Sequence, residues 1–351
     1  MSRTFKIGDR IVGPDHPPLI IAELSGNHNQ SLERALEITK AAADAGAHAL
    51  KLQTYTADLI TINHRGGLFE ISDPRSLWNG YSLYELYQEA YTPWEWHKEI
   101  FDYARSLGML AFSSPCDATS VDFLEGLDVP AHKVASFDST NYPLLKNIAE
   151  TGKPVIISSG AADLEDILAS VEYLKEHGSE DIVVLKCTST YPASPENTNL
   201  RTIPVFASVF PDCLVGLSDH TMGVGTSVAS VALGARVIEK HFTLRRADGG
   251  VDSAFSMEPD EMKALVTESL SAFQALGTVQ LRVQQVEKKS LNYRRSVYVV
   301  EDLKAGDTLT EENLRIIRPG DGMDPRQYES MLGKRIRRDV GRGTPFSLDF
   351  V

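Results

Sequence analysis

Between residues 19 and 242 the chain repeats one pattern: a short apolar run ends in polar residues, and a segment with helical periodicity usually follows. Short runs that are apolar throughout are typical of parallel strands covered on both faces. Eight such strands are predicted, at residues 19–24, 47–52, 109–112, 131–135, 154–157, 182–185, 214–217 and 236–238. Helices are predicted at 31–45, 93–106, 163–177, 224–233 and 259–276. The alternation predicts an α/β fold, a (β/α)8 TIM barrel, with a doubly wound open sheet as the alternative.

The C-terminal part follows a different pattern. Short strands are predicted at 296–300 and 314–317, and the turn-rich segment 302–310 is echoed by 339–347. Such an echo indicates a small, pseudo-symmetric, β-rich module. Residues 281–351 carry 14 Lys and Arg against 11 Asp and Glu, a net charge of +3 that leaves −16 for the rest. We therefore expect a barrel domain over 1–280, a linker over 281–292 and a second domain over 293–351.

Composition narrows the function classes. The 351 residues are 42% hydrophobic and 24% charged, which is ordinary for a soluble globular protein. The net charge of −13 argues against a nucleic-acid partner, because phosphate binding requires clustered Lys and Arg. No apolar run is long enough to cross a membrane and none resembles a signal peptide, so we expect a cytoplasmic protein. Cys116, Cys187 and Cys213 lack metal-site spacing and are interpreted as packing residues.

Polar side chains follow every predicted barrel strand. In a TIM barrel the catalytic groups gather at the carboxyl ends of the strands. In chain order those ends carry Glu23, Lys51 with Gln53, Ser113 with Ser114, Lys133 with Ser136, Ser158 with Ser159, Lys186 with Ser189, Ser218-Asp219-His220, and Glu239-Lys240-His241. Any one of them is an ordinary strand-end residue. Together they predict a ring of cations, hydroxyls and two imidazoles around one mouth.

Two imidazoles at neighbouring strand ends indicate a metal site. Either His220 or His241 alone is better explained as a strand-end residue that bonds to the backbone, but the pair suits a divalent ion with open positions. Lys51 and Lys133, with the hydroxyls of Ser114, Ser136, Ser158 and Ser218, suit a small anion such as a phosphate ester. The alternative is that both lysines only pair with Glu23 or Glu239. A metal-polarised carbonyl beside a bound phosphate ester indicates carbon–carbon bond chemistry.

The segment 61–93 is long for a strand-to-helix connection and rich in aromatic residues. Long loops in compact domains are often functional, so a lid or a dimer contact is one interpretation. The other is that a helical patch at 83–90 packs its aromatic side chains on the barrel.

Several motifs resemble those of the sialic acid synthase family. They are Ile21-Ala22-Glu23-Leu24-Ser25-Gly26-Asn27-His28, Lys51-Leu52-Gln53-Thr54-Tyr55-Thr56, Lys133-Val134-Ala135-Ser136, Ser218-Asp219-His220 and Glu239-Lys240-His241, and the C-terminal part resembles that family's antifreeze-like (SAF) domain. The pseudaminic acid branch is most similar in four further segments: Ser82-Leu83-Tyr84-Glu85-Leu86-Tyr87, Thr92-Pro93-Trp94-Glu95-Trp96-His97, Lys186-Cys187-Thr188-Ser189-Thr190-Tyr191-Pro192 and Asp252-Ser253-Ala254-Phe255-Ser256.

The resemblance implies a transferase that condenses phosphoenolpyruvate with an open-chain N-acetylated amino sugar. For the pseudaminic branch the implied acceptor is 2,4-diacetamido-2,4,6-trideoxy-L-altrose, and phosphate is released. His220 and His241 are implied to hold manganese, with magnesium or cobalt as alternatives. Phosphoenolpyruvate is implied to bind to Lys51, Ser114, Lys133, Ser136, Ser158, Ser189 and Ser218. The implied catalytic residues are Glu23, Tyr191 and Asp252, and the implied sugar-binding residues are Gln53, Asp138, Tyr191, Asp252 and Arg318.

The resemblance also implies a domain-swapped homodimer, in which Arg318 of one tail domain reaches the barrel of the other subunit. Two departures from the family pattern matter. Ser189-Thr190-Tyr191 replaces the Asn-Tyr of sialic acid synthases, which fits the pseudaminic branch, and Asp138 stands where a Glu is expected, one methylene shorter. The alternatives are an N-acetylneuraminate or legionaminate synthase and, in a different class, a non-catalytic carbohydrate-binding protein.

Overall fold

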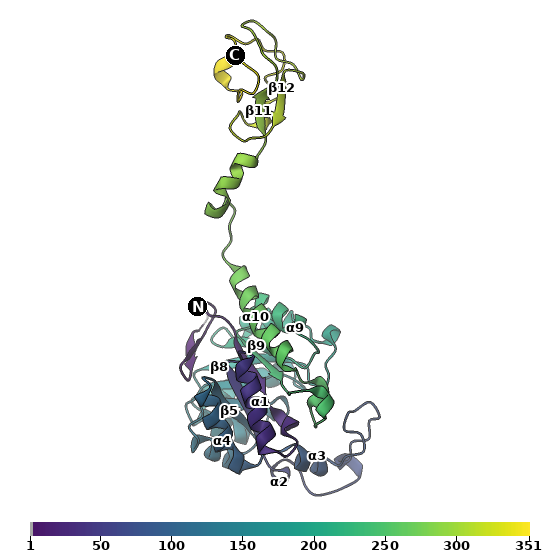
Figure 1. The fold of residues 1–351 in the computed structure, drawn as a ribbon. Coiled ribbons are helices and arrows are strands. Elements are labelled where there is room, and N and C mark those ends of the chain that lie inside the picture. The colour runs from purple at the N-terminus through teal and green to yellow at the C-terminus, as the bar shows by residue number, and fades with distance from the viewer. Residues whose placement is uncertain (1–2) are drawn as a thin grey trace. The chain divides into compact units, whose positions relative to one another are not determined.

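The structure is a computed structural model that describes residues 3–351. The chain divides into two compact units, Met1–Gly277 and Thr278–Val351, drawn in Figure 1. The first contains the α/β alternation and the second the β-rich part. Each unit is described by itself.

The first unit is a closed parallel barrel. Its strands follow one another in the order β10-β3-β4-β5-β6-β7-β8-β9, which closes because β10 pairs with both β3 and β9. The strands are β3 (Leu19–Glu23), β4 (Ala49–Thr54), β5 (Leu110–Pro115), β6 (His132–Val134), β7 (Val155–Ser158), β8 (Ile182–Cys187), β9 (Leu214–Ser218) and β10 (Val237–His241). Almost every strand residue is buried, because side chains fill the inside and helices cover the outside.

Helices surround the strands (Figure 1). They are α1 (Leu32–Asp44), α2 (Ala57–Ile60), α3 (Leu83–Ala90), α4 (Trp94–Ser106), α5 (Ala118–Glu125), α6 (Tyr142–Ala149), α7 (Leu164–Glu176), α8 (Thr202–Val209), α9 (Gly225–Ala232) and α10 (Pro259–Leu276). Several begin at a side-chain cap. Ser31 accepts from the Arg34 N–H at the start of α1, and Asp163 and Asp166 cap each other reciprocally at the start of α7. Among the described residues, no helix combines the length and apolarity needed to span a membrane.

The predicted TIM barrel is confirmed, with a strand at each of the eight predicted positions. The pattern missed the N-terminal hairpin of β1 (Phe5–Ile7) and β2 (Arg10–Val12), whose strands are too short to show a period. It also missed α5, α6 and α8, each of only eight residues. Two helical turns give too few positions to separate a helical period from a loop.

Strand register places the polar strand ends in one row. Glu23 pairs with His241 on β10 and with Lys51 on β4, and Glu239 pairs with Ser218 on β9. Alternate residues of a strand point to the same side, so Glu239 and His241 share the inner face while Lys240 takes the outer one. The ring of polar groups is therefore set by backbone pairing.

The second unit contains the antiparallel pair β11 (Ser296–Val299) and β12 (Leu314–Ile317). Its small core includes Val297, Leu314 and Phe346. The two echoed segments pair with each other, because Leu303 bridges Val340 in antiparallel fashion. The predicted small β-rich domain is confirmed.

Candidate active site

Four buried charged groups of opposite sign meet inside the barrel near its carboxyl end. Glu23, Lys51, Lys133 and Glu239 are each at most 5% exposed. Lys51 forms an ion pair with Glu23, and the Glu239 Oε1 atom lies 3.9 Å from the Lys51 Nζ and 3.8 Å from the Lys133 Nζ. Burying an unpaired charge is very costly, so in the ligand-free protein the buried lysines require the buried glutamates as partners. Both lysines pair with the glutamates, and their predicted role in binding an anion stays a prediction.

The protonation of this cluster is finely balanced. Burial raises the pKa of Glu23 to about 7, against the pull of Lys51 and with the help of Glu239. Burial also lowers the pKa of Lys133. An entering anion would be attracted to both lysines and would compete with the carboxylates for them. The cluster is therefore suited to receive a compact, multiply charged anion while Glu23 takes up or releases a proton near neutral pH.

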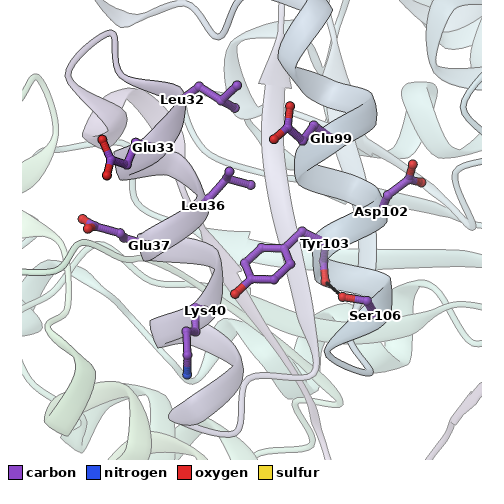
Figure 2. Close-up of a pocket in the computed structure, with 9 residues that line it drawn as sticks. All are labelled: Leu32, Glu33, Leu36, Glu37, Lys40, Glu99, Asp102, Tyr103 and Ser106. Atoms are coloured by element: carbon purple, nitrogen blue, oxygen red, sulfur yellow. Dashed lines mark hydrogen bonds between the residues drawn. The ribbon is translucent and has the colours of Figure 1, made fainter.

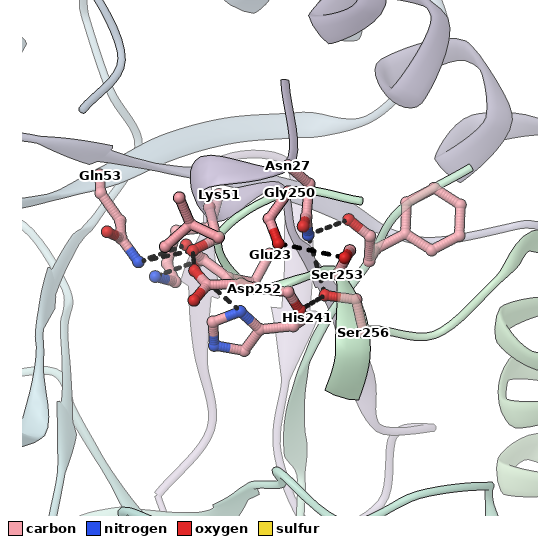
Figure 3. A network of polar contacts seen from close by, with 12 residues as sticks. Glu23, Asn27, Lys51, Gln53, His241, Gly250, Asp252, Ser253 and Ser256 are labelled. Carbon is pink, nitrogen blue, oxygen red and sulfur yellow. Dashed lines mark hydrogen bonds and ion pairs between the residues drawn. The ribbon is translucent and has the colours of Figure 1, made fainter. Parts of the chain in front are cut away.

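A chain of hydrogen bonds connects Glu23 with Asp252. The Gln53 Nε2 donates to the Glu23 Oε1 at 3.1 Å and to the Ser25 Oγ at 3.1 Å, and the Ser25 hydroxyl donates to the Asp252 carboxylate. Ser25 holds a positive φ of 52°, which is rare for a residue with a side chain. Figure 3 shows Glu23, Lys51, Gln53 and Asp252 gathered beside His241. The predicted residues of this part of the site are thus brought together.

The two imidazoles fit a divalent metal ion. The ring centroids of His220 and His241 are 5.2 Å apart. The His220 Nδ1 bonds to the Thr188 carbonyl at 3.0 Å, which orients the ring and leaves its Nε2 for a ligand. The His241 Nδ1 is buried without a hydrogen-bond partner among the described residues, 3.9 Å from the Asp252 Oδ2. Burial and nearby cations hold the pKa of His241 well below its usual range, so its imidazole is neutral, as a metal ligand requires.

The predicted anion-binding hydroxyls lie around the lysines and across the mouth from β5 to β9. Ser114 accepts from the Lys51 Nζ at 3.2 Å, and Ser218 contacts Glu239 at 3.4 Å. The Ser158 hydroxyl is buried without a hydrogen-bond partner among residues 3–351, as expected of a donor kept for a ligand.

Gly160 keeps a space open between two further hydroxyls. Its N–H donates to the Ser136 Oγ at 3.2 Å, and a Cβ at this position would clash with the hydroxyls of both Ser136 and Ser189. A glycine is thus required where three hydrogen-bonding groups converge. This convergence supports an anion site on the β6–β8 side of the mouth.

Aromatic rings cover the imidazoles. Tyr191 lies with its ring centroid 4.5 Å from that of His220, and Phe255 lies 5.0 Å from His241. Trp78 of the long loop reaches this cluster: its ring is 5.7 Å from Tyr191, and its Nε1 donates to the Val251 carbonyl at 2.9 Å. One end of the loop therefore lies against the metal-side wall of the site.

The other end of the loop packs on the barrel. Helix α3 buries Leu86 and Ala90, and the Tyr87 ring makes an edge contact with Tyr55 at 5.7 Å. Residues 83–90 thus pack as the second interpretation held, and a lid or a dimer contact by this loop stays a prediction.

Two further residues, Asp138 and Arg318, were predicted to bind the sugar. Asp138 ends a short 3₁₀ turn after β6, and burial raises its pKa to about 6. Arg318 lies in the second unit, in an exposed loop after β12. The structure places Asp138 near the barrel mouth and does not define the position of Arg318 relative to it.

Three residues of the site were not among the predicted site residues. Glu239 was considered as a strand-end group and as a possible partner of the lysines, but it was not assigned to the site. Ser25 begins the short 3₁₀ turn Ser25–His28, and Trp78 lies outside the helices and strands, so neither carries a periodic signal. Ser25 could have been found from its place two residues after Glu23, whereas Trp78 was marked only as one of the aromatic residues of the long loop.

A groove on the molecular surface lies away from these groups. A groove of about 810 Å³ runs between α1 and α4 on the outside of the barrel, with Leu36 facing Tyr103 across it (Figure 2). Its lining comes from outer helices, whereas the buried charges and imidazoles come from strand ends. The groove is therefore not part of the candidate site.

Comparison with known proteins agrees with this geometry. The family model described as the NeuB family matches residues 38–281, and the SAF domain model matches residues 294–351. The chain belongs to the NeuB family. The chain is similar to the pseudaminic acid synthase of Campylobacter jejuni subsp. jejuni serotype O:2, with 44% identity over 94% of this chain and 95% of that protein's length.

Two further relatives of this NeuB-family protein are informative. The pseudaminic acid synthase of Helicobacter pylori is 39% identical over 95% of this chain and 97% of its own length. A crystal structure of N-acetylneuraminic acid synthetase from Leptospira borgpetersenii, in complex with citrate, is 31% identical, with a TM-score of 0.74 over 84% of this chain and 97% of that one.

We predict that Glu23 titrates near pH 7 in the ligand-free protein. Because its pKa is raised from 4.5 to about 7, the folded protein keeps this proton over a range in which the unfolded chain has lost it. Its contribution to the free energy of unfolding is therefore full below pH 4.5 and is lost as the pH rises through 7. Carbon-13 NMR of glutamate labelled at the side-chain carboxyl measures the midpoint. Glu23→Gln removes the resonance and identifies it, and a midpoint below pH 5 would contradict the assignment.

Proposed function

We propose that this protein is a pseudaminic acid synthase. It condenses phosphoenolpyruvate with 2,4-diacetamido-2,4,6-trideoxy-L-altrose and water, giving pseudaminic acid and phosphate. The observation that carries the proposal is the pair of buried lysines, Lys51 and Lys133, in one mouth with the imidazoles of His220 and His241. The identity of 44% and 39% to two pseudaminic acid synthases, over nearly the whole chain, supports this acceptor.

The anion side of the mouth would hold phosphoenolpyruvate. Lys51 and Lys133 provide positive charge, and Ser114, Ser136, Ser158, Ser189 and Ser218 provide neutral donors that orient the phosphate and the carboxylate. Because both lysines are buried, their attraction for the anion is screened far less than it would be at the surface.

The metal side would hold the sugar. His220 and His241 would bind the divalent ion, for which we propose manganese, with magnesium or cobalt as alternatives. A bound metal ion supplies Lewis-acid polarisation of the aldehyde oxygen. Tyr191 lies over both imidazoles, and Asp252 lies 3.9 Å from the His241 Nδ1, so both are placed to contact the open-chain sugar. Gln53 and Asp138 would complete its polar contacts.

The reaction then needs one new carbon–carbon bond and one water molecule. The enol carbon of phosphoenolpyruvate attacks the aldehyde carbon, which becomes the new alcohol. Water adds to the resulting cationic carbon and loses one proton, which balances the proton that the new alkoxide takes up. The tetrahedral intermediate then expels phosphate, which leaves with the hydroxyl proton, and the keto group remains. Glu23, with a pKa of about 7 and a hydrogen bond from Gln53, is suited to accept the proton of that water.

Other functions are less well supported. An N-acetylneuraminate or legionaminate synthase would use the same core chemistry, but Ser189-Thr190-Tyr191 follows the pattern of the pseudaminic branch. A non-catalytic sugar-binding protein would have no use for four buried charges, which are costly to keep. The cytoplasmic location expected from the sequence stays a prediction.

We also propose that the enzyme is a domain-swapped homodimer. The segment after α10 exposes apolar side chains, with Val279 88%, Leu281 93% and Val286 81% accessible. Side chains of this kind in a connecting segment gain stability when a second copy covers them. Arg318 is exposed in the second unit, where it would reach the acetamido group of a sugar in the partner's barrel.

An acceptor panel tests the proposed function. Purified protein with phosphoenolpyruvate and manganese is offered the altrose derivative, the legionaminate precursor and N-acetylmannosamine, and phosphate release is measured. We expect the altrose derivative to be turned over at least about tenfold more efficiently than the others, since only its pattern of substituents fits the whole site. His241→Ala serves as the inactive control. Turnover of N-acetylmannosamine alone would reject the proposed acceptor.

Glu23→Gln tests the proposed base. The variant keeps the size of the side chain but cannot accept a proton, so we expect turnover to fall by about 10²–10⁴-fold. The affinity for phosphoenolpyruvate, measured by calorimetry, should change much less, because Lys51 and Lys133 remain. An equal loss of turnover and affinity would mean that Glu23 binds the substrate instead of moving a proton.

Subunit mixing tests the shared site. Arg318→Ala and His241→Ala proteins are each expected to have little activity. After subunit exchange, the mixed dimer contains one intact barrel covered by one intact tail, so activity should return to about a quarter of the wild-type value. The same mixture without exchange is the control. No recovery, with exchange verified by mass spectrometry, would count against a site built from two subunits.

A further inference from the structure

The residues beside the two imidazoles form a buried ion pair of their own. Asp219 precedes His220 and Lys240 precedes His241, and their side chains are at most 1% exposed. The Lys240 Nζ donates to the Asp219 Oδ2 at 3.0 Å. Because neighbouring residues of a strand point to opposite sides, the pair lies behind the imidazoles, between the barrel wall and the outer layer.

Every polar atom of the pair is already used. The Lys240 ammonium also donates to the carbonyls of Thr221 at 2.6 Å and Gly223 at 3.2 Å. The Asp219 carboxylate accepts from the Thr221 N–H at 2.9 Å and from the Ser227 hydroxyl at 2.6 Å. An ammonium group with three acceptors and a carboxylate with three donors have little capacity left for a substrate. Asp219 and Lys240 must therefore act indirectly, through the strand ends and the helix that they connect.

The ion pair of Asp219 and Lys240 joins the two strand ends that carry His220 and His241. The Asp219 N–H also donates to the Glu239 carbonyl at 2.9 Å, so β9 and β10 are joined by backbone and by side chains at the same level. Ser227 adds helix α9 to this connection. Nothing comparable restrains the His241 ring itself, whose Nδ1 has no hydrogen-bond partner among the described residues.

We propose that Asp219 and Lys240 are positioning residues that set the distance between His220 and His241, and with it the affinity for the metal ion. The proposal rests on the metal site of the proposed function. Partners that orient metal ligands typically contribute about 10–100-fold to metal affinity. Phosphoenolpyruvate binding depends on Lys51 and Lys133, which this ion pair does not contact, and should be spared.

The test is a manganese titration of metal-stripped, full-length protein, followed by electron paramagnetic resonance. Lys240→Met and Asp219→Asn each leave one buried charge unpaired, so a loss of affinity in either could reflect a damaged fold. The double variant removes both charges together, and neutral replacement of a buried pair is commonly tolerated. We expect the double variant to unfold at nearly the wild-type denaturant concentration and to bind manganese about 10–100-fold more weakly.

A matched control is Glu125→Gln. It breaks a polar cluster with His132 and Lys153, both at 2.9 Å, at the opposite ends of the strands. This variant should bind manganese as tightly as the wild type. Phosphoenolpyruvate affinity, measured by calorimetry, should stay within about threefold of wild type in all variants that fold.

The outcomes separate the two claims. Wild-type manganese affinity in the folded double variant would overturn the positioning role and leave the metal site intact. Equal loss of manganese and phosphoenolpyruvate affinity would show a general disturbance of the mouth and would also overturn it. Failure of the wild-type protein to bind manganese, magnesium or cobalt would overturn the metal site and this inference together.

Discussion

Closure of the parallel barrel in one fixed register is the constraint on which the site depends. When β10 pairs with β3 and β3 with β4, His241, Glu23 and Lys51 come into one row without any contact between their side chains being needed. A shift of one residue would send each of them to the outer face. The arrangement of these site residues is therefore as stable as the pairing of the barrel strands.

Closure of the barrel also buries four charged side chains. Glu23, Lys51, Lys133 and Glu239 come from four different strands, and each is tolerated only because the others are present. Burial is the main reason why the pKa of Glu23 rises to about 7, and the neighbouring Glu239 adds to the rise, whereas Lys51 and Lys133 oppose it. Without a ligand, the charges of the two lysines are compensated by the two glutamates. An anion can bind when the lysines exchange their contacts with the carboxylates for contacts with the anion.

The fold was largely predictable from the sequence, because eight apolar runs with polar ends leave few arrangements other than a barrel. Much of the site could be predicted from the fold, because the strand register brings strand-end residues such as Lys51 and His241 close together. Residues outside the strands and the long helices could not be found in this way. Trp78 reaches Tyr191 only through the path of a long loop, and Ser25 acts through a backbone angle that no periodicity records. The position of Arg318 depends on how the units are arranged, which the pattern of one chain does not encode.

The backbone of Ser25 is strained, although Ser25 belongs to the hydrogen-bonded chain of the site. A left-handed backbone costs a residue with a side chain about 1–2 kcal/mol, whereas glycine adopts it freely. Glycine here would relieve that strain but remove the only hydroxyl between Gln53 and Asp252 in this chain of bonds. Selection for thermal stability alone would favour glycine at this position. Serine at this position therefore keeps the hydrogen-bonding hydroxyl at the cost of backbone strain, and a thermostabilised variant should leave it unchanged.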